Sequence, residues 1–190
     1  MSSGIHIVDI DVIPIVVRGD IDFAISEGKT RIHTSIIVRL LTNDDNIEGI
    51  GEIVCAPPGK PEELPEEILG AIENVVKPVL VGLDATARIK ASTLVNAALK
   101  GKHWTKAGIN NAMYDLQAKV MRTSVSTLLG GPLSCDVPIM GTVIGLNTPD
   151  FMANQAFETA KMGYRAVKIK VGETLSTDVA RVTAVREAVG

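Results

Sequence analysis

Apolar and polar residues alternate along the first third of the chain, with the period of β-strands that bury one face. A first run alternates Val8, Ile10 and Val12 with aspartates, and a second run over 31–42 places five residues on one face: Ile32, Thr34, Ile36, Val38 and Leu40. Residues 43–46 supply turn chemistry, and 47–54 forms a third run. The pattern predicts a three-stranded antiparallel meander, with residues 18–29 as a polar surface loop.

The spacing of apolar residues becomes helical from residue 68 onward. Three stripes follow one another: Ile68, Ile72, Val75 and Val76; Ala91, Leu94, Val95 and Ala98; and Ile109, Ala112, Met113, Leu116 and Val120. Before them, the proline-rich run 56–61 fits neither strand nor helix, and four glutamates around Pro65 suit a helix N-terminus. Strands followed by helices predict an α+β domain over residues 1–131.

After Pro132 the order becomes strand, helix, strand, helix, with short links. We expect strands over 137–144 and 166–171, a helix from Pro149, and a last helix striped by Val179, Val182, Val185 and Val189. This order is the repeat of a parallel sheet or a (β/α) barrel. Two parallel strands leave both edges unpaired, so we expect a longer polypeptide or further subunits to complete the sheet, and the chain alone to self-associate.

Composition narrows the class of protein. With 46% hydrophobic residues the chain can bury a core, which excludes intrinsic disorder. A formal charge of −3 and 3% aromatics argue against a nucleic-acid partner. The chain shows no signal-peptide pattern and no apolar run of the roughly 18 residues that span a bilayer, so we expect a cytoplasmic protein with no membrane partner. Cys55 and Cys135 are interpreted as ordinary thiols.

The segment 167–171 carries the chemistry that stands out. Alternation puts Lys168 and Lys170 on one face of the strand and Val167, Ile169 and Val171 on the other. An amphipathic strand with its lysines in water is one interpretation. If helices cover the valine face, however, the lysines point into the barrel, where an unpaired ammonium is costly to bury. At the carboxyl end of a barrel strand such lysines would serve as catalytic groups.

Several motifs together resemble the enolase superfamily, and within it the mandelate racemase and muconate lactonizing enzyme family. They are 49–52 (GIGE), 112–119 (AMYDLQAK), 128–131 (LLGG) before Val137-Pro138, and 162–172 (MGYRAVKIKVG), which carries the Lys-x-Lys motif. The resemblance covers essentially the whole chain. It implies that residues 1–131 are a capping domain and that residues 132–190 are the first two units of an incomplete (β/α) TIM-type barrel. It also implies a Mg²⁺-dependent enzyme that abstracts the proton α to the carboxylate of a small molecule.

The resemblance also assigns residues. It implies that Lys170 is the base on one face of the substrate and that Lys168 is its electrostatic neighbour, which also helps to hold the substrate carboxylate. Thr142 matches a position that often lines the pocket, although a hydroxyl bonded to the backbone explains it equally well. The loops 19–29 and 54–61 match the two segments that close over the substrate. Two further residues receive no catalytic role: His33 is expected in solvent, and Glu52 is expected to be structural.

The family's metal-binding carboxylates lie on barrel strands beyond those in this sequence, so we expect this chain to hold no metal ligand. The main hypothesis is therefore the N-terminal part of a cycloisomerase, racemase or dipeptide epimerase that is homo-oligomeric when complete and inactive as this piece. Two alternatives stay open. The chain could be a non-catalytic fragment or a subunit of a split barrel, or a barrel enzyme in which Lys170 forms a Schiff base.

Overall fold

The computed structural model describes residues 4–25, 28–55 and 63–190. The backbone divides into two compact units: the first holds 1–17 and 33–133, and the second holds 18–32 and 134–190. The tip of the first hairpin is therefore grouped with the C-terminal segment. The predicted domain boundary between residues 131 and 132 remains a prediction about the complete protein.

The first unit is built on a three-stranded sheet in the order β1 (Ile7–Ile25), β2 (Gly28–Thr42) and β3 (Glu48–Val54). The strands run antiparallel, and β2 pairs with β3 in a register that sets Val38 opposite Gly51. The inner face of β2 presents Ile36, Val38 and Leu40 to the core, as the alternation predicts. The meander of the predicted α+β fold is thus confirmed.

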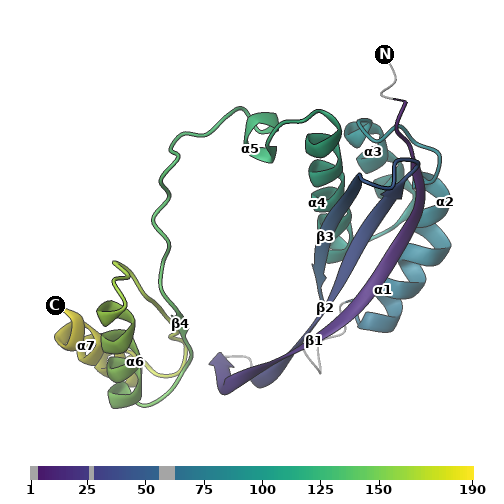
Figure 1. Ribbon diagram of the computed structural model, residues 1–190. Coiled ribbons are helices and arrows are strands. Elements are labelled where there is room, and N and C mark those ends of the chain that lie inside the picture. Colours follow the sequence, from purple (N-terminus) through teal and green to yellow (C-terminus); the bar gives the residue numbers. More distant parts are fainter. Residues whose placement is uncertain (1–3, 26–27, 56–62) are drawn as a thin grey trace. The chain divides into compact units, whose positions relative to one another are not determined.

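Helices cover one face of this sheet, as Figure 1 shows. They are α1 (Pro65–Ala71), the π-helical turn η1 (Ile72–Val76), α2 (Lys77–Leu80), α3 (Arg88–Ala98) and α4 (His103–Val120). The short α5 (Val125–Leu128) follows α4 and buries none of its own residues. The core between the layers includes Ile68, Ile72, Met113 and Leu116, all almost fully buried. All three predicted helical stripes lie on these helices.

Strand β3 lies directly on α4, and glycines make this close approach possible. A Cβ placed on Gly51 would come within 3.0 Å of the carbonyl oxygen of Gly108 and 2.9 Å from the amide nitrogen of Ala112. A Cβ on Gly49 would meet the backbone of Ala112 in the same way. Because the neighbouring atoms are backbone, they cannot move aside as the end of a flexible side chain could.

Residues of α4 also fasten the outer edge of β3. The Asp115 carboxylate accepts a hydrogen bond from the amide of Ile50 at 2.8 Å, and Lys119 donates to the carbonyl of Glu48 at 2.9 Å. Lys119 and Asp115 also form an ion pair at 2.6 Å. In the motif 112–119, the polar residues Asp115 and Lys119 therefore bond to the edge of β3, while its buried apolar residues pack in the core between sheet and helix.

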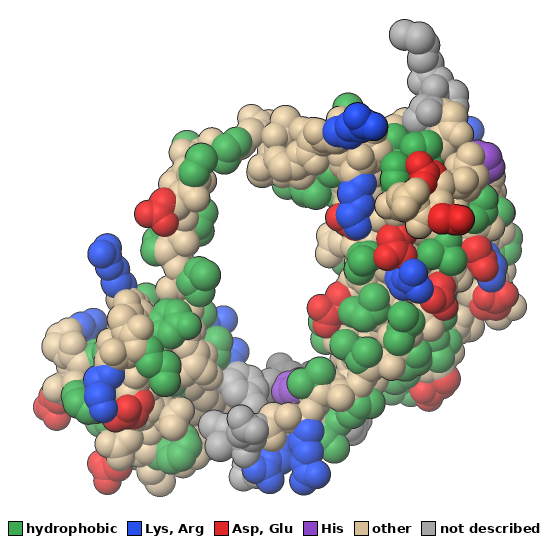
Figure 2. Space-filling view, viewed as in Figure 1, with side chains coloured by type: hydrophobic (Ala, Val, Ile, Leu, Met, Phe, Trp, Pro, Cys, Tyr) green, Lys and Arg blue, Asp and Glu red, His purple; other side chains and the backbone are tan. Residues whose placement is uncertain are grey.

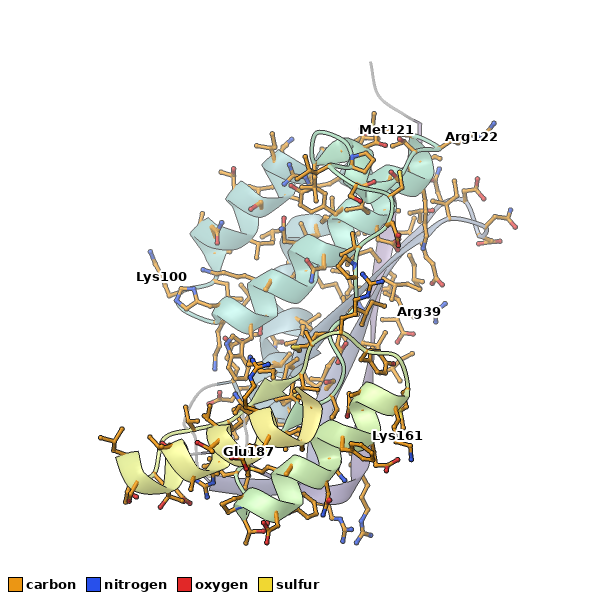
Figure 3. All side chains as sticks on the ribbon, turned by 90° about the vertical axis from the view of Figure 1, so that its left-hand side faces the viewer. Arg39, Lys100, Met121, Arg122, Lys161 and Glu187 are labelled. Atoms are coloured by element: carbon orange, nitrogen blue, oxygen red, sulfur yellow. The ribbon has the colours of Figure 1, made fainter. Side chains whose placement is uncertain are left out.

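The other face of the sheet carries charge. Arg39 lies between Asp11 and Glu48, at 3.2 Å and 2.7 Å from their carboxylates; Figure 3 labels it on the sheet. Figure 2 shows acidic and basic side chains interspersed over this unit. The sheet is therefore apolar toward the helices and mixed on its far side, where these charged residues stand among exposed apolar ones such as Val8, Ile50 and Val54.

Two predictions in this region are wrong. Residues 18–25 and 28–29 are strand rather than surface loop, because the neighbouring strands β1 and β2 continue beyond the predicted runs. In β1, Val8 is exposed and Ile7 is buried instead. There the backbone of Ile7 bonds to Gly82 and Leu83, and the alternation shifts before Ile10. The predicted loop 56–61 lies outside the described residues.

The second unit contains a parallel pair of short strands, β4 (Val143–Ile144) and β5 (Lys168–Ile169), with helices α6 (Pro149–Lys161) and α7 (Leu175–Val189). The order strand, helix, strand, helix is as predicted, but the two predicted strands are longer than the observed ones. One further backbone bond, from Gly141 to Ala166, continues the pairing toward the start of the strands. Among the described residues β4 and β5 pair only with each other, so few bonds define each strand.

Packing in this unit centres on Ile144, Met152, Ala156 and Val185. The predicted valine stripe of α7 is buried only in its second half: Val179 and Val182 are exposed, and Arg181 is the buried residue of the first half. No helix in the described part of the chain is long and apolar enough to cross a membrane.

Candidate functional site

The lysine pair lies on the face of β5 that points away from the helices. Val167 and Ile169 pack against the small core of the second unit, and alternation turns Lys168 and Lys170 to the other side. Lys168 is exposed and Lys170 is half-buried. The orientation required by the barrel interpretation is therefore present, while proton transfer by Lys170 remains a prediction.

The backbone around the lysines is fixed by β4. Val143 is paired with Lys168, and Ile144 with Ile169. The amide of Lys170 donates to the carbonyl of Ile144 at 2.9 Å. Lys170 therefore stands at the carboxyl end of the parallel pair, which is where barrel enzymes place reactive side chains.

Thr142 immediately precedes β4 and is exposed. On the residue before it, Gly141, an added Cβ would meet the methyl group of Thr159 and the side chain of Tyr164, so the chain passes close to α6 at this point. Pairing with β5 brings Val143, rather than Thr142, opposite Lys168. A role for Thr142 in lining a substrate pocket stays a prediction.

The tip of the first hairpin meets the carboxyl end of β4. The amide of Leu146 donates a hydrogen bond of 2.8 Å to the carbonyl of Ala24, within the second unit. The segment 19–29, although mostly strand rather than loop, therefore reaches the same end of the parallel pair as Lys170. This placement is compatible with a segment that covers a substrate.

The second expected capping segment, 54–61, lies mostly outside the described residues. Its described neighbour Glu63 is buried, and its carboxylate accepts bonds of 2.7 Å from the amides of Trp104 and Thr105 and from the Thr105 hydroxyl. Glu63 thus caps the N-terminus of α4, where the free amides favour an anion. At the other end of the segment, burial raises the pKa of the Cys55 thiol, with a smaller contribution from Glu63, so Cys55 is a poor nucleophile.

A buried arginine beside the lysine strand was not expected from the sequence. Arg181 donates to the carbonyl of Asn147 and to the carboxylates of Asp178 and Glu173. The amide of Gly172, and then Arg181, lower the pKa of Asp178. Burial opposes the charge of Arg181, but Glu173 and Asp178 outweigh it and raise the pKa of the guanidinium. In the sequence, the i, i+3 spacing of Asp178 and Arg181 on one helix could have indicated an ion pair. Glu173 and Asn147 lie 8 and 34 residues from Arg181, so local spacing does not indicate these contacts.

The remaining candidates play no part in this arrangement. His33 is exposed, as expected, and Glu52 is exposed on β3. In the described part of the chain no three His, Cys, Asp or Glu side chains come together as metal ligands. The residues present therefore do not form a Mg²⁺ site, and no chemical step can be derived through Mg²⁺ from them.

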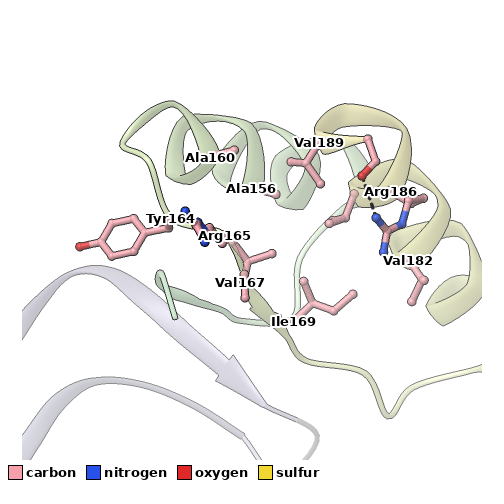
Figure 4. A pocket seen from close by; sticks show the side chains of 12 residues that line it. Ala156, Ala160, Tyr164, Arg165, Val167, Ile169, Val182, Arg186 and Val189 are labelled. Atoms are coloured by element: carbon pink, nitrogen blue, oxygen red, sulfur yellow. Dashed lines mark hydrogen bonds between the residues drawn. The ribbon is translucent and has the colours of Figure 1, made fainter. Parts of the chain in front are cut away.

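A groove of about 390 Å³ lies between α6, α7 and β5. Figure 4 shows that Val167, Ile169, Val182 and Val189 line it, with Arg186 donating to the carbonyl of Gly190 at its rim. The groove lies on the helix side of β5, and neither lysine lines it. It is therefore not the candidate active site.

Comparison with known proteins adds family evidence. Residues 10–130 match the family model described as mandelate racemase / muconate lactonizing enzyme, N-terminal domain. An N-succinyl-L-Arg/Lys racemase from Bacillus cereus is 32% identical over 168 residues, which cover 88% of this chain and 45% of the relative. The chain thus spans about half the length of the curated relatives it matches.

Solved structures agree with this match. A dipeptide epimerase from Enterococcus faecalis, complexed with Mg and the dipeptide L-Leu-L-Tyr, superposes with a TM-score of 0.88 at 30% identity, over 97% of this chain and 51% of that one. A muconate lactonizing enzyme from Pseudomonas fluorescens, complexed with muconolactone, gives a TM-score of 0.88 at 26% identity, over 97% of this chain and 50% of that one. From the matched domain, the sheet and helices of the first unit and the lysine strand of the second, we conclude that this chain belongs to the mandelate racemase/muconate lactonizing enzyme family of the enolase superfamily.

Proposed function

We propose that the complete protein is an isomerase or lyase that abstracts the proton α to the carboxylate of a small molecule, and that Lys170 is the base on one face of the substrate. The observation that carries the proposal is the orientation of the lysine pair. Val167 and Ile169 pack on the helix side, so alternation assigns Lys168 and Lys170 to the opposite face, and Lys170 directly follows the last residue of β5. Racemases, epimerases and cycloisomerases among the relatives support the reaction class.

In this proposal the two lysines have different roles. The Lys170 amine takes the α-proton while the electron pair of the broken C–H bond passes into the carboxylate as an enediolate. Lys168, as an ammonium, stabilises the negative charge that grows on the carboxylate oxygens. The hairpin tip, bonded to Leu146 through the Ala24 carbonyl, helps to cover the substrate and exclude water.

The complete enzyme would use Mg²⁺ to stabilise the enediolate, with ligands from outside this chain. Two similar dipeptide epimerases were solved as complexes with Mg, whereas the described residues here contain no ligand cluster. We therefore propose that the 190-residue chain is inactive by itself. We also propose a homo-oligomeric complete enzyme with small carboxylates as its partners, rather than nucleic acid or membrane.

The test is deuterium incorporation at the α-carbon, resolved by stereochemistry, for a panel of N-acyl amino acids, dipeptides and muconates with the complete protein. Lys170→Ala is expected to slow exchange from one face by at least about 100-fold. Lys170→Arg is expected to be nearly as slow, because a guanidinium does not release its proton near neutral pH. Lys168→Ala is expected to weaken substrate binding.

Lys161→Ala is the matched control. This exposed lysine on α6 pairs with Glu158 and lies over the Phe157 ring, both on its own helix. Exchange from both faces at the wild-type rate in Lys170→Ala would contradict the proposal. Covalent trapping of a carbonyl substrate on Lys170 by borohydride would instead support Schiff-base chemistry.

A further inference from the structure

Arg181 is almost fully buried in the second unit, at 5% relative exposure. Its guanidinium donates in three directions: Nε to the Asn147 carbonyl at 2.7 Å, Nη1 to Asp178 at 3.0 Å and Nη2 to Glu173 at 2.7 Å. Every one of its nitrogen atoms therefore has an acceptor. A buried ion pair adds little net stability, because desolvation offsets the attraction, so this geometry calls for another explanation.

Two of the three acceptors belong to the loops that follow the two parallel strands, and the third lies on α7. Asn147 follows β4, and Glu173 lies in the turn between β5 and α7. Asp178 lies at the start of α7 and bonds to the segment between β5 and α7. Its Oδ2 accepts hydrogen bonds from the amides of Gly172 at 2.8 Å and Glu173 at 3.3 Å. Arg181 is thus the side chain that connects the β4 loop to the β5 turn.

This connection lies just beyond the last backbone bond between the strands. The ladder of β4 and β5 has two residue pairs, and the bond from Lys170 to Ile144 follows it. After that bond the two chains diverge into their loops. Lys170 is two residues before Gly172. Backbone motion in the turn would therefore also displace the backbone of Lys170.

We infer that Arg181 is a positioning residue, which clamps the carboxyl ends of β4 and β5 together and so holds Lys170 in place. The clamp itself follows from the hydrogen bonds above, and its catalytic consequence rests on the proposed function. A lysine at position 181 would keep the charge but could not reach three acceptors in a plane, because its ammonium lacks the fixed fork of a guanidinium.

The first test is amide hydrogen exchange, followed by mass spectrometry on the 190-residue chain. Arg181→Lys is expected to speed exchange in segments 144–147 and 170–174 by about tenfold, with the centres of α6 and α7 unchanged. Arg186→Lys is the matched control, because Arg186 lies on the same helix, is exposed and donates to the Gly190 carbonyl, away from both loops. It is expected to exchange like the wild type.

Wild-type exchange in Arg181→Lys would overturn the clamp, and so would an equal increase across both helices, since that pattern reports a general loss of packing. If Arg181→Lys does not fold, Glu173→Gln serves instead. The Glu173 side chain is half-exposed, and its replacement removes one charged bond while the shape is kept. It is expected to speed exchange in 172–174 alone, and unchanged exchange there would count against the clamp.

Catalysis supplies the second readout. In the complete enzyme Arg181→Lys is expected to lower kcat for α-proton exchange about tenfold with little change in KM, because Lys170 is misplaced while substrate binding persists. An equal kcat in wild type and variant would overturn the positioning role. If the wild type exchanges no carboxylate at all, the proposed function fails, and the hydrogen-exchange result still decides the clamp.

Discussion

The close contact between β3 and α4 gives a sharp prediction: Gly51→Ala destabilises the first unit. The new methyl group would lie under 3.0 Å from the Gly108 carbonyl oxygen and from the Ala112 amide nitrogen. Both are backbone atoms inside the core layer, so strand and helix must separate. Overpacking of this kind costs about 3 kcal/mol. Restricting the unfolded chain returns about 0.5–1 kcal/mol, since alanine has fewer unfolded conformations than glycine.

The net loss of about 2 kcal/mol corresponds to a Tm lower by roughly 4–8 °C for a chain of this size. Thermal unfolding followed by circular dichroism measures it. Gly70→Ala is the matched control: Gly70 lies in α1, and an added Cβ there has its nearest neighbour, the Asn74 amide nitrogen, at 4.0 Å. This control is expected to raise Tm slightly through the helix preference of alanine. A Gly51→Ala chain that melts at or above the wild-type temperature would refute the packing argument.

Three further predictions concern the second unit and the metal. The hydrogen bonds from the Gly172 amide and Arg181 lower the pKa of Asp178, so its stabilising contribution is present above the ordinary aspartate pKa and is lost as the pH falls through the lower folded pKa. The turn 172–174 should therefore open only in acid, and Asp178→Asn should show no such acid step in amide exchange. Calorimetry with Mg²⁺ should give no one-site micromolar isotherm, because the described residues hold no ligand cluster. Light scattering with an apolar dye should show self-association, since Val171, Leu175, Val179 and Val182 are exposed beside β5; a monodisperse, dye-free monomer would contradict this.

Much of the first unit could be predicted because its signals are periodic. Ile36, Val38 and Leu40 alternate strictly, and the stripe from Ile109 to Val120 keeps helical spacing over about three turns. The sequence predicts a loop over 18–29 because Gly19, Asp20 and Asp22 are typical turn residues, whereas the structure has strand over 18–25 and from Gly28. Extended pairing between β1 and β2 overrides such local preferences, and nothing in a local window reports it.

For the candidate site, the sequence could indicate which face of the strand each residue occupies, because local alternation determines this. The faces of Lys168 and Lys170 follow from period two once helices cover the valine side. The contact of Arg181 with Asn147 joins residues 34 apart, and it depends on how two loops meet. The strand lengths also escaped prediction, because a strand ends where its partner ends, and β4 and β5 support each other over two pairs only.

The side chains that fasten β3 to α4 have a consequence for how this chain meets its own copies. The outer edge of β3 is a row of backbone groups on which another strand could add, but Asp115 and Lys119 already occupy the Ile50 amide and the Glu48 carbonyl. That edge is closed to strand addition. Association between copies by strand addition is therefore expected at the short, two-pair ladder of β4 and β5 rather than at β3.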